Sequence, residues 1–459
     1  MSRGGAGSLD RFTPPVPGAV RSFDFPEVSR SSLSNGLEVW SAAAPRVPLV
    51  TLSLVLPVGE AGVPQERAGA LALTADALEG GTLRRSGTEL AEAFERLGIT
   101  FSAAAGWDGT SLSVTCLADR MERAVALLAE VAMEPAFPGD EVNRLREQSL
   151  SRIRQRLMDP SGFATDRAAA LFYADEVPYA RPVGGTEASV SDLTPEVLRS
   201  FWERCFRPRG AAVVAVGDLD TQALAGALEA AFGAWTGDAP SRPDFAPEPR
   251  ADGRAVHVVH RPGSVQSELR IGHVGAPRDT PDYVPLAVAN TVLGGSFTSR
   301  LNLNLRERNG FTYGVRSRFS FRRQAGPFTV STAVGSDQTA PAAREVMAEL
   351  ETFARQGPTE EETATARDYI AGVFPLQLET TSQVAGRITE IVVYDLPEDW
   401  PTFFRDRVRS VTAQAAADAA RRHIRPGSAQ IVVVGDAEAV TSTLEAEGLG
   451  PVTVHDGVG

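Results

Sequence analysis

Histidine is scarce in this chain of 459 residues, and the first 256 residues contain none. Neither H-x-x-E-H nor H-E-x-x-H occurs anywhere, and the histidines present are His257, His260, His273, His423 and His455. A zinc site built on a helix with two histidines is therefore excluded from the first half of the chain. The first three of these histidines lie in strand-like segments, where a surface or core role is far commoner than metal binding.

Cysteine, lysine and long apolar runs are also rare or missing. Cys116 and Cys205 are far apart, which excludes a cysteine-based zinc pattern and argues against a disulfide framework. Lysine is absent altogether, so Gly294-Gly295 cannot belong to a G-x-x-x-x-G-K-[ST] phosphate loop. No apolar run reaches about 18 residues, so we expect no membrane span. The net charge of −13 disfavours a nucleic-acid partner.

The composition that remains is that of an ordinary globular protein, 43% hydrophobic and 22% charged, and long enough for two or more cores. Residues 1–30 are rich in Gly, Pro and Ser and lack an apolar signal-peptide core. We interpret them as a flexible arm of a cytoplasmic protein. A periplasmic protein from which the signal peptide had been removed would look the same.

The chain repeats itself. Arg207-Pro208, followed by Val214–Asp218, recurs as Arg425-Pro426, followed by Val432–Asp436, at a constant offset of 218 residues. In each copy an apolar strand follows a helix. The repeat predicts two α+β domains of similar fold, at residues 31–234 and 255–459.

Residues 235–254 lie between the two halves and contain four prolines among charged residues, which is typical of an extended linker. Strand-like segments in both halves alternate in polarity and come in hairpin-like pairs. We therefore expect mainly antiparallel sheets with helices on one face.

The segment Gly69–Thr82 reads GALALTADALEGGT. In frame and flanks it resembles the active-site helix of the pitrilysin/insulinase-type zinc peptidases, which carries H-x-x-E-H between a Gly and a Gly-Thr. Ala72 and Asp76 stand at the two histidine positions, and Ala75 stands at the general-base position. Since alanine neither binds zinc nor activates water, the resemblance implies a member of this family with a degenerate zinc site and no metal of its own.

The third ligand of the family, a Glu on a later helix, is replaced as well. The boundaries Phe137-Pro138-Gly139 and Asp159-Pro160 predict a helix over residues 140–158. Aligning the flanks places Leu145 and Arg152 at the two acidic positions of the family, with Arg152 at the ligand. Because the family fold brings that position close to Asp76, we expect an Asp76–Arg152 ion pair in place of the metal. The alternative is that both side chains turn to water.

The resemblance covers residues from about 30 to about 440, and it implies a six-stranded sheet backed by helices in each domain. In the family, a two-domain chain pairs with another as a clamshell that encloses a chamber. Some bacterial members and the mitochondrial processing peptidase use two different chains, of which only one carries zinc.

The second half contains Arg306-Glu307, then Gly310 and Tyr313, which matches the R-E-x-x-G-x-x-Y pattern of the family. The resemblance implies that Arg306 and Tyr313 reach across the chamber, hold the substrate backbone and stabilise the oxyanion at the zinc site. Because this chain has no zinc site, the pair would act on that of a partner. The alternative is that Arg306 pairs with a helix neighbour and Tyr313 packs at a strand start.

Two further segments concern the substrate. Gly294, Gly295, Ser296 and Phe297 resemble a short form of the substrate-contacting loop of non-catalytic subunits, and the alternative is a plain helix stop. The strand near Phe101–Thr110 corresponds to the edge strand that pairs with peptides in catalytic chains. Gly106-Trp107-Asp108 is expected to interrupt it.

These features favour a non-catalytic subunit of a heterodimeric zinc metallopeptidase that hydrolyses peptides or unfolded polypeptides. Its partner would be a homologous zinc-bearing subunit, and this chain would hold no cofactor. The alternative is a structural, assembly or peptide-binding protein, like the core subunits of the respiratory cytochrome reductase. A hydrolase with another mechanism has no support, because G-x-S-x-G and a Cys/His pairing are both missing.

Overall fold

The computed structural model describes residues 23–457, and it contains two six-stranded sheets. The first sheet has the strand order β1 (Val28–Ser32), β2 (Glu38–Ala43), β6 (Ala212–Gly217), β3 (Leu49–Leu56), β5 (Thr110–Leu117), β4 (Thr100–Ala105). The second sheet has the order β12 (Val452–His455), β7 (Ala255–His260), β11 (Gln430–Gly435), β8 (Gln266–Val274), β10 (Pro327–Gly335), β9 (Val315–Phe319). Most of the arm expected over residues 1–30 lies outside the described residues, and β1 already begins at Val28.

Both sheets are mixed, with most neighbours antiparallel. In the first sheet only the β2–β6 pair is parallel, with Trp40 opposite Val214. In the second sheet β11 and β12 both run parallel to β7. The duplicated motif identified in the sequence forms β6 and β11, which occupy equivalent inner positions of the two sheets.

One face of each sheet is covered by helices of its own half. In the first half these are α1 (Ala70–Ala77), α2 (Gly87–Arg96), α3 (Met121–Met133), α4 (Gly139–Met158), α7 (Pro195–Cys205) and α8 (Thr221–Phe232). In the second half they include α9 (Tyr283–Asn290), α11 (Thr339–Gln356), α12 (Glu360–Val373), α14 (Trp400–Ser410), α15 (Ala413–His423) and α16 (Ala437–Ala446). Short helices α6 (Glu187–Ser191) and α10 (Arg300–Asn302) lie in the connections.

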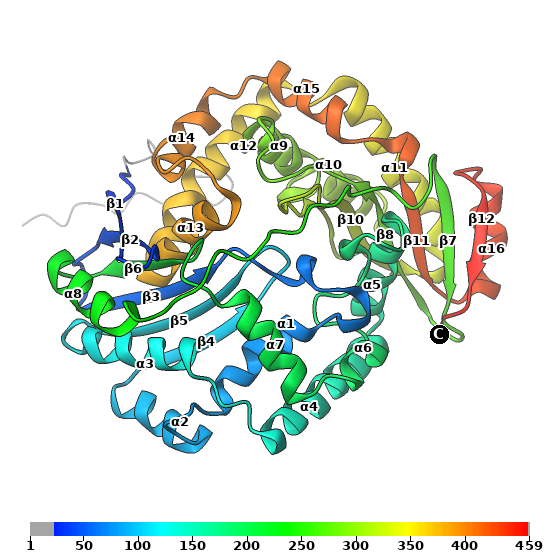
Figure 1. Ribbon diagram of the computed structural model, residues 1–459. Coiled ribbons are helices and arrows are strands. Elements are labelled where there is room, and N and C mark those ends of the chain that lie inside the picture. The colour runs from blue at the N-terminus through cyan, green and yellow to red at the C-terminus, as the bar shows by residue number, and fades with distance from the viewer. Residues whose placement is uncertain (1–22, 458–459) are drawn as a thin grey trace, which may run out of the picture.

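The opposite face of each sheet is covered by a helix from the other half (Figure 1). Helix α13 (Thr381–Tyr394) packs Ile388 and Ile391 against Val214 and Val216 of the first sheet. In return, α5 (Pro160–Phe172) packs Phe163 and Phe172 against β11 of the second sheet. The expectation of helices on one face only is therefore wrong.

The physical reason for this exchange lies in the inner strands. Every residue of β6 and of β11 is buried, so both faces of each strand need an apolar cover. The two halves cannot separate without exposing one face of each sheet. The hydroxyl of Thr381 adds a hydrogen bond of 2.8 Å to Thr51 across this contact.

The expectation that Gly106-Trp107-Asp108 interrupts a strand is wrong. The segment forms the turn of the β4–β5 hairpin. The N–H of Gly106 donates to the carbonyl of Gly109 over 2.8 Å. Asp108 is buried in this turn and accepts hydrogen bonds from the Tyr179 hydroxyl (2.9 Å) and the Arg323 N–H (2.9 Å). The hairpin leaves β4 at the edge of the first sheet, beside α1.

Among residues 23–457, no helix has the length and apolar character needed to cross a membrane.

Candidate functional site

Helix α1, which carries the degenerate zinc motif, is anchored by a buried carboxylate. Glu60 is fully buried and accepts the backbone N–H groups of Gly69 (3.0 Å) and Ala72 (2.8 Å) at the start of the helix. Burial raises the pKa of Glu60, and the two N–H donors oppose that rise. Gly69 adopts a φ of 87°, and a Cβ there would lie 2.5 Å from the carbonyl oxygen of Gly184. Glycine is therefore required at this position.

The two charged residues expected at the metal position do meet. The Arg152 guanidinium of α4 donates to the Asp76 carboxylate of α1 over 2.8 Å. The two side chains are 57% and 34% exposed, so the ion pair faces solvent rather than a closed interior. The expectation of an ion pair between the two helices is confirmed, and the alternative, in which both side chains turn to water, holds only in that the pair lies at the surface.

No other group replaces the metal ligands. Ala75 is buried and Ala72 is half-buried, so neither the base position nor the first histidine position presents a polar atom. Leu145, at the other acidic position, belongs to the apolar core. Within the described residues, no group of three or more His, Cys, Asp or Glu side chains could hold a metal ion. The site can bring a cation and an anion together, but it has neither a metal-ligand set nor a general base.

In the second half, the structure brings Arg306 and Phe297 together. Arg306 lies in a π-helical turn (Leu303–Arg308), and its guanidinium carbon is 4.1 Å from the centre of the Phe297 ring. It also pairs with Glu307 at 3.2 Å. Phe297 is 70% exposed, so this cation–π contact forms at the surface. The ion pair with Glu307 therefore confirms, for this one contact, the alternative in which Arg306 pairs with a helix neighbour.

Tyr313 is not packed at a strand start, because it is 99% exposed in the turn before β9. No hydrogen bond joins it to Arg306 among the described residues. The exposed Tyr313 and Phe297 side chains leave a phenol donor and an apolar ring available to a ligand.

The segment Gly294 to Phe297 divides into two parts. Gly294 and Gly295 end a second π-helical turn (Thr291–Gly295), and only the residues after them form a loop. Gly294 is buried, and a Cβ there would lie 2.5 Å from the Ser317 hydroxyl and 2.6 Å from the Ser317 nitrogen. Gly294 therefore serves close packing against β9, whereas Phe297 presents its side chain outward.

Asn302 positions this region, and the sequence analysis missed it. It is buried and its amide donates to the carbonyls of Ser296 (3.2 Å) and Val315 (2.8 Å) and to the Ser299 hydroxyl (3.0 Å). Its own oxygen accepts the N–H of Val315 over 3.2 Å. These bonds tie the loop that carries Phe297 to the start of β9. The sequence signal that could have indicated this role is a polar Asn between Leu301 and Leu303 in a helical segment.

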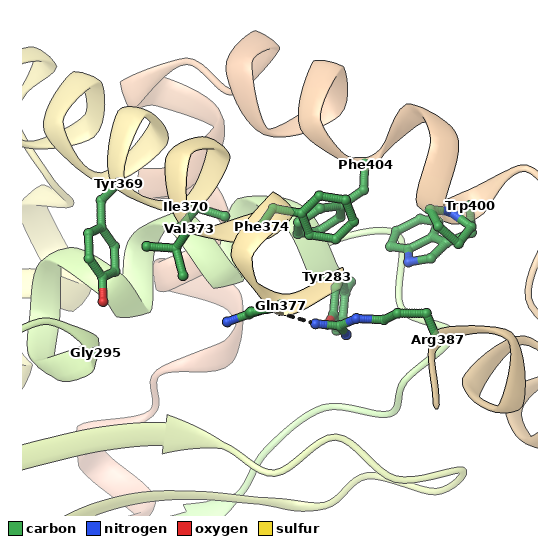
Figure 2. Close-up of a pocket in the computed structure, with 11 residues that line it drawn as sticks. Tyr283, Gly295, Tyr369, Ile370, Val373, Phe374, Gln377, Arg387, Trp400 and Phe404 are labelled. Carbon is green, nitrogen blue, oxygen red and sulfur yellow. Dashed lines mark hydrogen bonds between the residues drawn. The ribbon is translucent and has the colours of Figure 1, made fainter. Parts of the chain in front are cut away.

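A cavity of about 330 Å³ opens beside Gly295 (Figure 2). Figure 2 shows Tyr283, Phe374, Trp400 and Phe404 around it. Arg387 also lines the cavity, and its guanidinium donates a hydrogen bond of 2.9 Å to the Gln377 amide oxygen. Burial raises the pKa of Tyr283. The cavity is aromatic in character and adjoins the exposed glycine of the predicted substrate segment.

Comparison with protein-family models identifies the family of this chain. Residues 38–182 match the model described as "Insulinase (Peptidase family M16)", and residues 192–370 match "Peptidase M16 inactive domain". The chain belongs to the insulinase family of peptidases. The two matches together extend from residue 38 to residue 370, and the first includes the degenerate helix α1.

Two curated relatives of this insulinase-family chain come from bacteria. It is 28% identical over 362 residues to an uncharacterized zinc protease of Mycobacterium tuberculosis, covering 78% of this chain and 82% of the relative. It is 26% identical over 367 residues to an uncharacterized zinc protease of Streptomyces coelicolor, covering 79% of each.

Among solved structures, a peptidase M16 inactive-domain protein from Pseudomonas fluorescens is 26% identical, with a TM-score of 0.83 over 89% of this chain and 98% of that one. A protease from Helicobacter pylori, 19% identical, shares the fold with a TM-score of 0.81 over 89% and 99% of the two chains. These likenesses establish the two-domain α+β fold.

Proposed function

We propose that this chain is the non-catalytic subunit of a heterodimeric zinc metallopeptidase. Its partner is a homologous subunit with an intact H-x-x-E-H helix, and the zinc belongs to that partner. The observation that carries the proposal is the 2.8 Å ion pair between Asp76 and Arg152 where a catalytic member needs ligands. A chain with this pair has no hydrolytic site of its own.

The exposed group on the second half supports an action on the partner. Arg306 supplies a permanent positive charge, and Tyr313 supplies a fully exposed phenol. Donors of this kind stabilise the oxyanion that forms when water attacks a peptide carbonyl. In our proposal Arg306 leaves Phe297 when substrate is bound, and both donors reach the scissile bond on the partner.

Peptides or unfolded polypeptides are the proposed substrates, because a chamber between two such chains admits extended segments. The edge strand β4 offers unpaired backbone groups to an extended chain. Phe297, with Ser296 and Gly295, would contact the substrate from the second half. A cytoplasmic location is part of the proposal, and cell fractionation tests it.

The test is peptidase activity of the reconstituted pair on a quenched fluorogenic peptide. Arg306→Ala and Tyr313→Phe are each expected to lower kcat by about 10- to 10³-fold with the dimer intact. Arg344→Ala is the matched control, because Arg344 is also exposed and pairs with Glu447 at 3.0 Å. Wild-type rates from both site variants would instead favour the structural or assembly role.

A further inference from the structure

The buried guanidinium of Arg278 has no carboxylate partner within residues 23–457. It is 4% exposed, and none of its side-chain nitrogens has a hydrogen-bond or carboxylate partner among residues 23–457. Its Nη2 is enclosed by protein and makes no hydrogen bond. An unpaired buried charge is costly and rare in a folded protein, so its presence needs an explanation.

The guanidinium is held in place by two aromatic rings. Its central carbon lies 3.7 Å from the centre of the Tyr283 ring and 5.0 Å from that of Trp400. The backbone N–H of Arg278 donates to the carbonyl of Arg322 over 2.7 Å, which fixes the chain at its base. The side chain is therefore rigidly oriented, although no carboxylate in the described part of the chain neutralises it.

Two other arginines that have an enclosed, unbonded nitrogen are placed differently. Arg181 also has one unbonded nitrogen, but it donates to three backbone carbonyls, those of Glu60, Val63 and Pro64. Arg322 has one unbonded nitrogen as well, but it lines none of the three described cavities. Arg278 lines two of them, so its side chain borders open space, although Nη2 itself is enclosed.

The larger of these two cavities is a cleft of about 640 Å³ between the loop after β8, the end of α13 and α14. A second guanidinium, Arg407, lies there 4.7 Å from the Trp400 ring centre. Arg407 also has no carboxylate within ion-pair distance in the described part of the chain. The rest of the lining is largely apolar and includes Val284, Leu396, Pro397 and Val411.

Two acidic residues also line this cleft. Asp395 is already neutralised by Arg242 (2.5 Å) and Arg323 (2.8 Å). Asp279 is exposed and makes no ion pair within the residues described. The cleft therefore has two guanidinium groups without an ion pair, Arg278 and Arg407, and one unpaired carboxylate, Asp279. Its net charge is positive and its walls are largely apolar.

We propose that this cleft binds a carboxylate attached to an apolar body, with Arg278 as the anchor and Arg407 as a second donor. The fork of a guanidinium matches the two oxygens of a carboxylate, and a partly buried bond of this kind is strong. The apolar walls take the body of the ligand. The carboxylate belongs either to a small organic acid or to the C-terminal residue of a peptide, and the site does not depend on the proposed peptidase role.

Isothermal titration of the full chain tests this site. The probes are 3-phenylpropanoate and its neutral amide, acetyl-Gly-Leu with a free carboxylate and its C-terminal amide, and inorganic phosphate. We expect each carboxylate that fits to bind about 10- to 100-fold more tightly than its amide. Binding of the organic acid alone identifies a small-molecule site, and binding of the dipeptide identifies a peptide C-terminus.

Arg278→Met is expected to abolish this preference for carboxylate, while Arg344→Met, which changes an exposed paired arginine, leaves it intact. Because it removes an unpaired buried charge, Arg278→Met should not lower the thermal midpoint of the free protein. Arg407→Gln changes a half-buried side chain, so it should weaken carboxylate binding several-fold without affecting folding. If Arg278→Met fails to fold, this second variant tests the proposal. Equal affinity for acid and amide, binding of phosphate alone, or no binding up to about 10 mM would each overturn the proposal.

Discussion

The Arg152 guanidinium lies 2.8 Å from the Asp76 carboxylate and joins α4 to α1 at the position where catalytic insulinase-family members are expected to hold zinc. The pair keeps the two helices connected through side chains. Unlike zinc, it does so at the surface, where solvent weakens the attraction.

Arg152→Ala is therefore expected to lower the free energy of unfolding by less than about 1 kcal/mol. The side chains are 57% and 34% exposed, so neither charge becomes a buried orphan when the other is removed. Urea denaturation at low and at moderate salt measures the effect. A loss of 3 kcal/mol or more, about what a buried pair would cost, would contradict this description of the site.

Restoring the ligands should restore metal binding. The wild-type chain is expected to bind no stoichiometric zinc, because Ala72, Ala75, Asp76 and Arg152 supply no ligand set. The variant with Ala72→His, Ala75→Glu, Asp76→His and Arg152→Glu is expected to bind about one zinc per chain by elemental analysis. The same variant with Arg152 retained is the control, and equal zinc in both would show that the α4 position does not face the metal.

Asn302→Ala is expected to destabilise the protein by about 2–3 kcal/mol, since it leaves buried backbone groups of Val315 and Ser296 without partners. Chemical denaturation measures this loss. Asn302→Asp, which retains the acceptor for the Val315 N–H but replaces the donor with a second acceptor, is the matched comparison. If both variants are as stable as wild type, Asn302 does not organise the Phe297 loop.

His273 should make the protein sensitive to acid. Burial lowers the pKa of His273 to about 4, and its ring accepts the Arg425 N–H over 3.0 Å through Nε2. The unfolded chain takes up a proton near pH 6.5, whereas the folded chain resists until about pH 4, so stability falls as the pH drops through this window.

The expected loss from His273 is about 3 kcal/mol across that window. Unfolding free energies measured from pH 7 to pH 4 should show this slope, and His273→Gln should remove it, whatever the change in stability at pH 7. A slope that survives in the variant would assign the acid sensitivity to other groups.

Local patterns predicted much of the fold and the vacated metal position. The apolar strands β6 and β11, and a helix before each of them, follow from the duplication. The Asp76–Arg152 contact followed from the family resemblance, because a metal site requires its ligand positions to converge.

The remaining features depend on contacts between distant segments. Ile388 and Ile391 mark an amphipathic helix, but nothing in that pattern tells which sheet the helix covers. Asp108 looked like a loop residue, and it is buried because Tyr179 and Arg323 bring donors to it. The contact between Phe297 and Arg306 depends on a π-helical turn, which the periodicity of the sequence did not reveal.

The central claim is that this chain serves a zinc site on another chain. The most direct measurement titrates the purified chain into a homologous subunit with an intact H-x-x-E-H helix and records cleavage of a fluorogenic peptide. We expect neither chain alone to approach the rate of the mixture, and we expect activity to saturate at one copy of each. Full activity of the zinc-bearing subunit alone, unchanged by this chain, would contradict the account.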